Sequence, residues 1–286
     1  MTVTIDKYCE ENARNIWSNE ENAHKSYRKI VLFSKFSDFD TRLITKYLPS
    51  HVYSFFNFLE DELDFSDATI NRYHSALNSV FKHYNHQHKT DILPKVSWKK
   101  EDQGRVRFFS DTEINQLLLF FNKSIHPWIA DYVLFMLKTG MRRGEVNGIG
   151  LTKEQVGKNG CYGTIFIDHK TGRKAVHLKK TKNNDDRIVP LSETAEAALA
   201  NLDFCPSKYF RHHAYYDSWR YARDKICPND HTFVSHVCRH TAGTNLASSK
   251  YNDTQIGRFL GHKSPLTTKK YVHEDRETTI QMVDSL

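Results

Sequence analysis

The apolar residues of the first 90 positions recur at spacings of three and four, which is the repeat of an α-helix rather than of a β-strand. Ser66, Asp67 and Thr69 precede the clearest stripe and are residue types that favour helix N-termini. That stripe comprises Ile70, Tyr73, Leu77, Val80, Phe81 and Tyr84. The pattern predicts a small helical domain over residues 1–90, with helices around Ile5–Trp17, Asn22–Phe33 and His51–Leu63 and a fourth after Ser66.

Residues 91–107 lack this periodicity. The segment contains Pro94, Gly104 and charges of both signs, a composition typical of an exposed linker. A second domain, 108–286, then begins with SDTE at Ser110–Glu113, a capping box that precedes an apolar helix. Trp128–Thr139 is a strongly apolar helix that leads into Gly140.

The middle of the second domain changes from helical to strand periodicity. Between Thr152 and Pro190 the short runs Gly163–Ile167, Ala175–Leu178 and Arg187–Leu191 predict a small antiparallel sheet. Helices return from Ser192 onwards. The predicted fold class is therefore mainly α with a small antiparallel β-sheet, in two domains.

Basic residues exceed acidic ones, 41 against 34, for a formal charge of +7. The first 100 residues are nearly balanced, with 14 basic and 13 acidic side chains, whereas the remainder holds 27 and 21. A basic second domain favours a polyanionic partner such as nucleic acid. Five cysteines without a CxxC pair predict neither a disulfide framework nor a zinc knuckle. No signal peptide or run of about 20 apolar residues is present, so a cytoplasmic protein is expected.

Three short runs of the second domain carry candidate catalytic residues. They are TGMRRGEV at 139–146, HVCRH at 236–240 and LGHKSPLTTKKY at 260–271. Together they supply two arginines, two histidines and a tyrosine. Two planar guanidinium groups can bind the non-bridging oxygens of a phosphoryl group through paired hydrogen bonds, while a tyrosine hydroxyl can act as nucleophile. The combination predicts a phosphodiester-cleaving site.

With KTKNNDDRIVPL at 180–191, these runs resemble the catalytic domain of the tyrosine recombinases, the phage integrase family. The helical first domain is similar to the family's SAM-like, DNA-binding core-binding domain. Lys182 lies eight residues before Pro190, as the family's lysine does, and Lys180 and Lys179 are rival candidates. The catalytic set that the resemblance implies is Arg142, Lys182, His236, Arg239, His262 and Tyr271.

The resemblance also implies a role for each residue. The two arginines bind the scissile phosphate, whose charge concentrates on these oxygens in the transition state. His236 accepts the tyrosine proton or holds a phosphate oxygen, and His262 donates to a non-bridging oxygen. Lys182 protonates the departing 5′ oxygen, and Tyr271 is the nucleophile. Two further residues support the set: Glu145 orients Arg142, and His240 is structural.

Metal binding is the alternative for His236 and His240, because their spacing of i and i+4 also occurs in helical zinc sites. No general-base glutamate lies between them, and Arg239 would repel a cation. We therefore expect no metal. No cofactor is expected either, because a phosphotyrosine bond conserves the energy of the phosphodiester that it replaces.

The resemblance predicts a DNA strand-exchange enzyme that integrates or excises a phage or other mobile element through a 3′-phosphotyrosine. Its expected partners are duplex DNA sites, three further copies of itself in a homotetramer, and an accessory directionality or DNA-bending factor. Residues 272–286 form a tail that is expected to dock on a neighbouring protomer. Three alternatives stay open: a Xer-type dimer resolvase, a type IB topoisomerase, and a catalytically silent DNA-binding protein.

Overall fold

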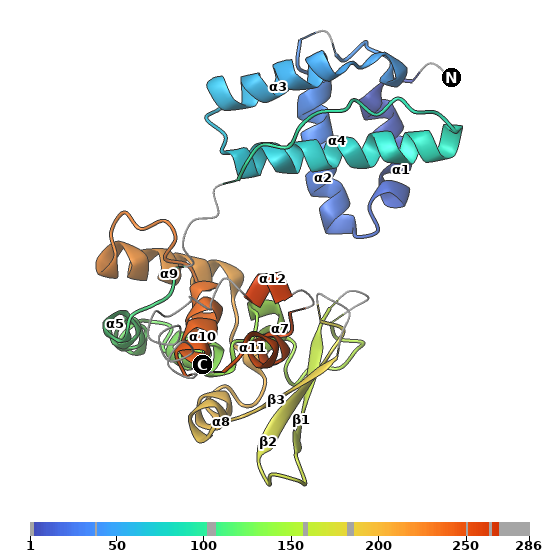
Figure 1. Ribbon diagram of the computed structural model, residues 1–286. Coiled ribbons are helices and arrows are strands. Elements are labelled where there is room, and N and C mark those ends of the chain that lie inside the picture. Colours follow the sequence, from blue (N-terminus) through green and yellow to red (C-terminus); the bar gives the residue numbers. More distant parts are fainter. Residues whose placement is uncertain are drawn as a thin grey trace, which may run out of the picture. The chain divides into compact units, whose positions relative to one another are not determined.

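A computed structural model of the chain describes residues 3–37, 39–101, 107–156, 160–181, 186–249, 251–262 and 265–268. The chain divides into two compact units, Met1–Gly104 and Arg105–Leu286. Both are helical, and the second also contains a three-stranded antiparallel sheet (Figure 1). The predicted fold class is confirmed. Within the described ranges, no helix is both long and apolar enough to cross a bilayer.

In its described residues, the first unit contains four α-helices and one short 3₁₀-helix. The helices coincide within a few residues with those expected from the periodicity, because the apolar stripes are the faces that become buried. Asn19 caps the second helix through a hydrogen bond from Asn22 N, and Pro49 opens the third. The bounds are α1 (Ile5–Ile16), α2 (Glu20–Ser34), η1 (Ile44–Lys46), α3 (Pro49–Asp61) and α4 (Asp67–His88).

Aromatic side chains fill the core of the first unit. Phe33 is fully buried, and its ring centroid lies 5.1 Å from that of Phe39, 5.0 Å from that of Tyr47 and 5.0 Å from that of Phe55. Tilted and edge-on pairs at such distances add to the stabilisation that burial alone provides. The core thus joins α2, α3 and the segment between them.

The segment expected to be an exposed linker begins as part of this unit. Ile92, Leu93 and Val96 pack against the core. Asn71 on α4 binds the backbone of Lys99 on both sides, donating to its carbonyl at 2.9 Å and accepting from its amide at 3.0 Å. Part of the segment predicted as a linker is therefore held to the first unit by contacts between residues far apart in sequence.

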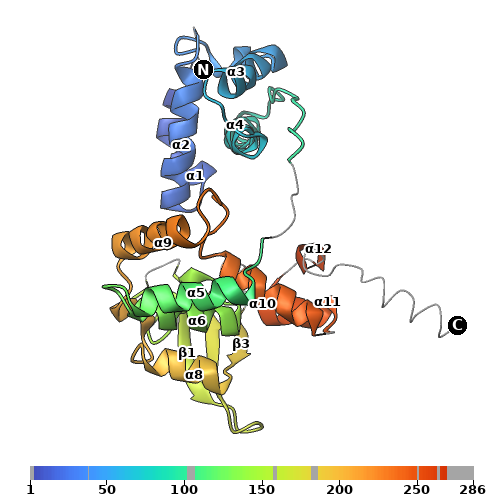
Figure 2. The ribbon, with the colours of Figure 1, turned by 90° about the vertical axis from the view of Figure 1, so that its left-hand side faces the viewer.

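The second unit surrounds one long apolar core. Helix α6 is central to it, with α5, α8 and α10 packed around it, and Figure 2 shows α5 lying over α6. The bounds are α5 (Asp111–Asn122), α6 (Trp128–Thr139), α7 (Arg143–Asn147), β1 (Tyr162–Ile167), β2 (Lys174–Lys179), β3 (Arg187–Pro190), α8 (Glu193–Ala200), η2 (Pro206–Lys208), α9 (His212–Ile226), α10 (Val237–Ser248), α11 (Asp253–Leu260) and α12 (Pro265–Thr268).

The three strands lie in the order β1-β2-β3, all antiparallel, where alternation of the sequence placed them. Val176 faces Val189 across the β2–β3 pair, and both are buried against the helices. The β1–β2 turn contains Gly172 in the left-handed conformation, with φ of 66°. The capping box at Ser110 and Glu113 also forms as predicted and begins α5.

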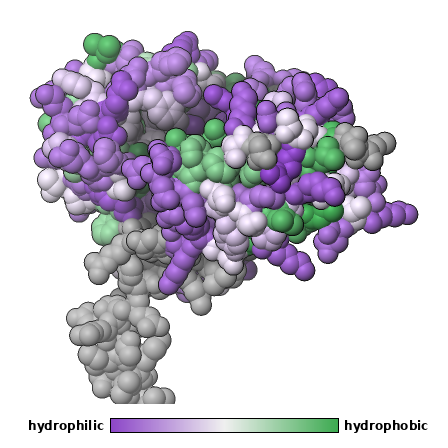
Figure 3. Space-filling view, turned by 90° about the horizontal axis from the view of Figure 1, so that it is seen from above, coloured by the Kyte–Doolittle hydropathy of each residue, from purple (hydrophilic) through white to green (hydrophobic). Residues whose placement is uncertain are grey.

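The surface seen from above is mainly hydrophilic, with apolar side chains exposed in limited patches (Figure 3). This view fits a chain whose charged residues make up 26% of the sequence.

Candidate active site

Arg142 is placed by the turn between α6 and α7. Gly140 ends α6 in the left-handed conformation, with φ of 60°, and its missing side chain leaves room for Leu260, since a Cβ there would lie 2.6 Å from Leu260 Cδ2. Arg142 is the N-cap of α7, and Glu145 accepts a hydrogen bond from its backbone N–H at 2.8 Å. The Arg142 Nη1 atom donates to the other oxygen of the same carboxylate, also at 2.8 Å. Glu145 therefore orients Arg142 through both its backbone and its side chain.

Arg239 lies on α10 and is only 2% exposed. Its guanidinium group donates to two backbone carbonyls, to Gly140 O at 2.7 Å and to Leu260 O. These carbonyls terminate α6 and α11, so one side chain joins the ends of two helices to a third. Burial of a charge at this depth requires such hydrogen bonds.

A third arginine, Arg187, was absent from the predicted catalytic set. It is the first residue of β3, and its side chain is 10% exposed. Its Nη2 atom lies 2.8 Å from Glu145 Oε2, and its Nη1 atom donates to Leu260 O. Alternation along β3 places it on the same face as buried Val189. A charged residue at an inward strand position was the signal that could have revealed it.

All three guanidinium groups donate to the backbone at the end of α11, Arg187 and Arg239 to Leu260 O and Arg142 to Gly261 O. Figure 1 shows α7 and α11 close together. Within the described ranges, Arg142 and Arg187 both pair with the carboxylate of Glu145. The cluster therefore holds three positive charges against one negative charge. Such an excess at a partly buried site favours an anion.

His262 follows α11 directly and is partly buried beside this cluster. Burial and then the charges of Arg239, Arg142 and Arg187 lower its pKa to about 4. The ring is therefore neutral near pH 7. Its Nδ1 atom lies 2.9 Å from the hydroxyl of Thr268, which is fully buried on α12. The contact with Thr268 thus fixes the orientation of the His262 ring.

His236 and His240 begin α10, where their rings lie edge to face with centroids 4.7 Å apart. His236 is exposed, while His240 is partly buried. The structure thus brings His236 to the same short helix segment as Arg239, as the i and i+3 spacing predicts.

As for the metal alternative, the described part of the chain contains no group of three histidine, cysteine or acidic side chains placed to hold a metal ion.

Lys182 and Tyr271, the two remaining members of the predicted set, lie outside the described residues, as does the tail 272–286. Lys180, the alternative candidate to Lys182, is described. It follows β2 with φ of 53°, and its N–H donates to Asp186 at 3.2 Å. A hollow of about 690 Å³ is lined by Lys180 together with Arg142 and Glu145. The β2–β3 connection therefore brings a lysine to the same hollow as Arg142.

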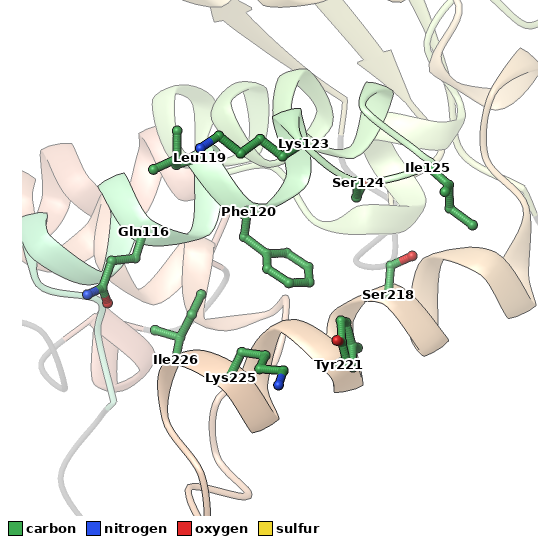
Figure 4. A pocket seen from close by; sticks show the side chains of 10 residues that line it. All are labelled: Gln116, Leu119, Phe120, Lys123, Ser124, Ile125, Ser218, Tyr221, Lys225 and Ile226. Carbon is green, nitrogen blue, oxygen red and sulfur yellow. The ribbon is translucent and has the colours of Figure 1, made fainter.

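Another hollow, of about 730 Å³, lies between α5 and α9 and includes none of these residues (Figure 4). The ring of Phe120 projects into it from α5, and Tyr221 faces it from α9. Its lining is mostly apolar, with Lys123 and Lys225 at its edge. It lacks the converging cations of the arginine cluster.

The family model described as "Phage integrase family" matches residues 206–278, a span that contains His236, Arg239, His262 and Tyr271. Among solved structures, the integrase of transposon Tn1549 in complex with a circular-intermediate DNA superposes with a TM-score of 0.73 over 100% of both chains, at 15% identity. The chain is thus similar to the phage integrase family over residues 206–278, and to a solved integrase in fold. A lambda integrase tetramer bound to a Holliday junction shares the fold of this chain with a TM-score of 0.63, at 14% identity over 96% of this chain and 78% of that one.

Curated relatives include proteins of mobile elements. Transposase B of transposon Tn554 from Staphylococcus aureus is 22% identical over 236 residues, which are 74% of this chain and 35% of the relative. A putative integrase of Pseudomonas phage Pf1 is 24% identical over 202 residues, 71% of this chain and 55% of its own length. Tyrosine recombinase XerC of Corynebacterium glutamicum is 30% identical over 157 residues, which are 50% of this chain and 46% of the relative. The chain thus spans about a third to a half of the curated relatives that it matches.

Proposed function

We propose that this protein is a site-specific DNA recombinase that breaks and rejoins duplex DNA through a phosphotyrosine bond at Tyr271. The observation that carries the proposal is the arginine cluster, in which Arg142 and Arg187 share the carboxylate of Glu145 while Arg239 donates to the backbone carbonyls of Gly140 and Leu260. A phosphodiester supplies the missing negative charge. Its two non-bridging oxygens match the paired donors of a guanidinium group.

The exposed fractions of Arg142 and Arg239 support different roles for the two side chains. Arg142 is 22% exposed and lines the hollow, so it can reach a phosphate that enters from solvent. Arg239 is buried, and its donations to two backbone carbonyls hold its charge in place beside Arg142. His262, neutral near pH 7, donates a hydrogen bond without adding charge. Donors held in advance of the reaction stabilise a transition state more effectively than mobile ones do.

The proposed reaction conserves bonds and protons. The hydroxyl oxygen of Tyr271 attacks phosphorus, and its proton passes to His236 or to a phosphate oxygen. The bond from phosphorus to the 5′ oxygen breaks, and Lys182 protonates that oxygen. The products are a 3′-phosphotyrosine and a free 5′-hydroxyl. A 5′-hydroxyl of a partner strand reverses the step, so neither ATP nor a metal is chemically required.

The biological role follows from the relatives. The matches to transposon and phage proteins favour a mobile-element integrase, whereas the match to XerC keeps a dimer resolvase as the second candidate. The lambda integrase structure is a tetramer on a Holliday junction, and we propose the same assembly here, on duplex DNA sites. The first unit would clamp the DNA beside the catalytic unit, and an accessory bending or directionality factor would join the complex. We propose that this activity takes place in the cytoplasm of a bacterial or phage-infected cell.

The test is capture of a covalent protein–DNA adduct. Because the target sequence is unknown, we would incubate the full chain with a pool of nicked duplexes of randomised sequence, whose cleavage releases a short fragment and prevents religation. Adducts that survive denaturation would be recovered and sequenced. Peptide mass spectrometry would then identify the linked residue, which we expect to be Tyr271.

Two controls separate the alternatives. Tyr271→Phe keeps the ring but lacks the attacking oxygen, so it should bind the selected duplex without forming an adduct. Joining of two selected duplexes distinguishes a recombinase from a topoisomerase, which relaxes supercoils as a monomer. Binding without any adduct by the unmodified chain would favour the silent DNA-binding protein and refute the proposal.

A further inference from the structure

Arg187 is the buried cation that the predicted catalytic set leaves without a role. Its side chain is 10% exposed, and its two terminal nitrogens are both engaged, one by Glu145 and the other by Leu260 O. These partners lie 42 residues before it and 73 residues after it in the chain. Arg187 therefore connects the sheet to two elements that carry other members of the site.

The first connection fixes Glu145. This carboxylate is 3% exposed, and both of its oxygens have donors. Oε1 accepts from Arg142 Nη1, while Oε2 accepts from the Arg142 backbone and from Arg187 Nη2, each at 2.8 Å. Because Glu145 in turn orients Arg142, the position of the Arg142 guanidinium group depends on Arg187. Sharing the carboxylate also leaves Arg142 with more uncompensated charge for a phosphate than a private ion pair would.

The second connection fixes the end of α11. Leu260 O accepts from both Arg187 and Arg239, and His262 follows two residues later. Gly261 lies directly against Arg187, since a Cβ at this position would be 2.1 Å from Nη1. The same carbonyl is thus held by one arginine of the predicted pair and by Arg187. Its position sets where the His262 ring leaves the helix.

The third connection concerns the segment that bears the candidate lysines. Asp186, the residue before Arg187, accepts from the backbone N–H of Lys180. The two ends of the β2–β3 connection are therefore closed next to the residue that contacts Glu145. Movement of Arg187 would therefore disturb the end of β2 that bears Lys180.

The geometry points to Arg187 as a positioning residue that sets Arg142, Arg239 and His262 around one phosphate; this inference rests on the proposed function. Arg187 acts through Glu145 and the Leu260 carbonyl rather than by touching the DNA. A planar guanidinium fork can bridge these two acceptors at once, whereas the single ammonium of a lysine cannot hold the same geometry.

The experiment compares Arg187→Gln and Arg187→Lys with the unmodified full chain on the duplex selected above. Three quantities are measured: single-turnover cleavage at saturating protein, duplex affinity, and the melting temperature. We expect Arg187→Gln to slow cleavage by about 100-fold, the scale of losing one charge-stabilising group. Arg187→Lys should remain slowed by more than about tenfold, and affinity should change by less than about threefold in both. Arg220→Gln, which removes an exposed arginine paired with Asp217 on its own helix, is the matched control and should leave cleavage unchanged.

A double-mutant cycle with Glu145→Gln separates positioning from loss of fold. If Arg187 acts through Glu145, adding Arg187→Gln to Glu145→Gln should slow cleavage by less than about threefold further, because residues in one network are not additive. All rates are taken well below the melting temperature of each variant. Additive effects, near-normal cleavage by folded Arg187→Gln, or full rescue by Arg187→Lys would each overturn the inference while the recombinase proposal stands. If the unmodified chain forms no adduct, the proposed function fails and this inference fails with it.

Discussion

Replacing Gly261 with alanine tests the packing of the arginine cluster, because this residue combines a left-handed backbone with close contact to a buried cation. Its φ is 69°, and an added Cβ would lie 2.1 Å from Arg187 Nη1 and 3.1 Å from its Cδ. Gly172→Ala is the matched control. That glycine has φ of 66°, but nothing lies within 4 Å of an added Cβ. The two substitutions share the backbone cost and differ in the contact with Arg187.

The backbone cost of a left-handed alanine is about 1 kcal/mol, which is the whole effect expected for Gly172→Ala. Gly261→Ala must also displace the Arg187 guanidinium group from Glu145 and Leu260 O. Breaking a buried ion pair costs about 3–5 kcal/mol. With partial relaxation of the long side chain, we expect a total of about 3 kcal/mol, or about 2 kcal/mol more than the control.

The assay is urea unfolding followed by tryptophan fluorescence in a Trp17→Phe, Trp98→Phe background. The remaining tryptophans, Trp128 and Trp219, both lie in the second unit, so the signal reports that unit alone. We expect a lower midpoint for Gly261→Ala at unchanged slope. Equal losses of stability for the two glycine variants, within about 0.5 kcal/mol, would refute the close packing of Gly261 on Arg187.

Three further predictions concern chemistry and pH. Arg142→Ala and Arg239→Ala should each slow single-turnover cleavage by about 10²–10³-fold. Arg239→Ala should lower the melting temperature more than Arg142→Ala does, because the Arg239 side chain is buried. Near-normal cleavage by either variant would contradict the paired binding of phosphate. Burial raises the pKa of Glu113, but hydrogen bonds from Arg107, Ser110 and Cys227 outweigh it and lower the pKa to about 2. The stabilisation by Glu113 is therefore present above its ordinary pKa of 4.5 and is lost as the pH falls towards 2. Glu113→Gln should make the free energy of unfolding less dependent on pH in this range. An unchanged pH dependence would contradict the hydrogen bonds to Glu113. Adduct formation should persist in EDTA, with DNA binding confirmed in the same buffer. A loss of the adduct that zinc or magnesium restores would support the metal alternative for His236 and His240.

The sequence predicted elements whose causes are local. The capping box at Ser110, the apolar stripe of α4 and the alternation of the three strands each depend on residues a few positions apart, and all appear in the structure. The contact between Arg142 and Glu145 has a similarly local cause, because both residues lie in one short run. The 3₁₀-helices and the bounds of α7 carried no comparable signal.

Contacts between distant residues were beyond the sequence. Residues 92–99 looked like a linker because the partner of Lys99, Asn71, lies on a helix 28 positions earlier. Arg187 was overlooked as a site residue for the same reason, since Glu145 and Leu260 approach it only in the folded chain. The choice between Lys180 and Lys182 depends on the β2–β3 connection and stays a prediction.

The central claim is that a phosphate bound by the arginine cluster is attacked by Tyr271. The most direct measurement is to digest the covalent adduct formed on the selected nicked duplex and to locate the nucleotide remnant by mass spectrometry. The account predicts a 3′-phosphonucleotide on the peptide that contains Tyr271, with no adduct from Tyr271→Phe. An adduct on any other residue, or an undiminished adduct from Tyr271→Phe, would contradict it.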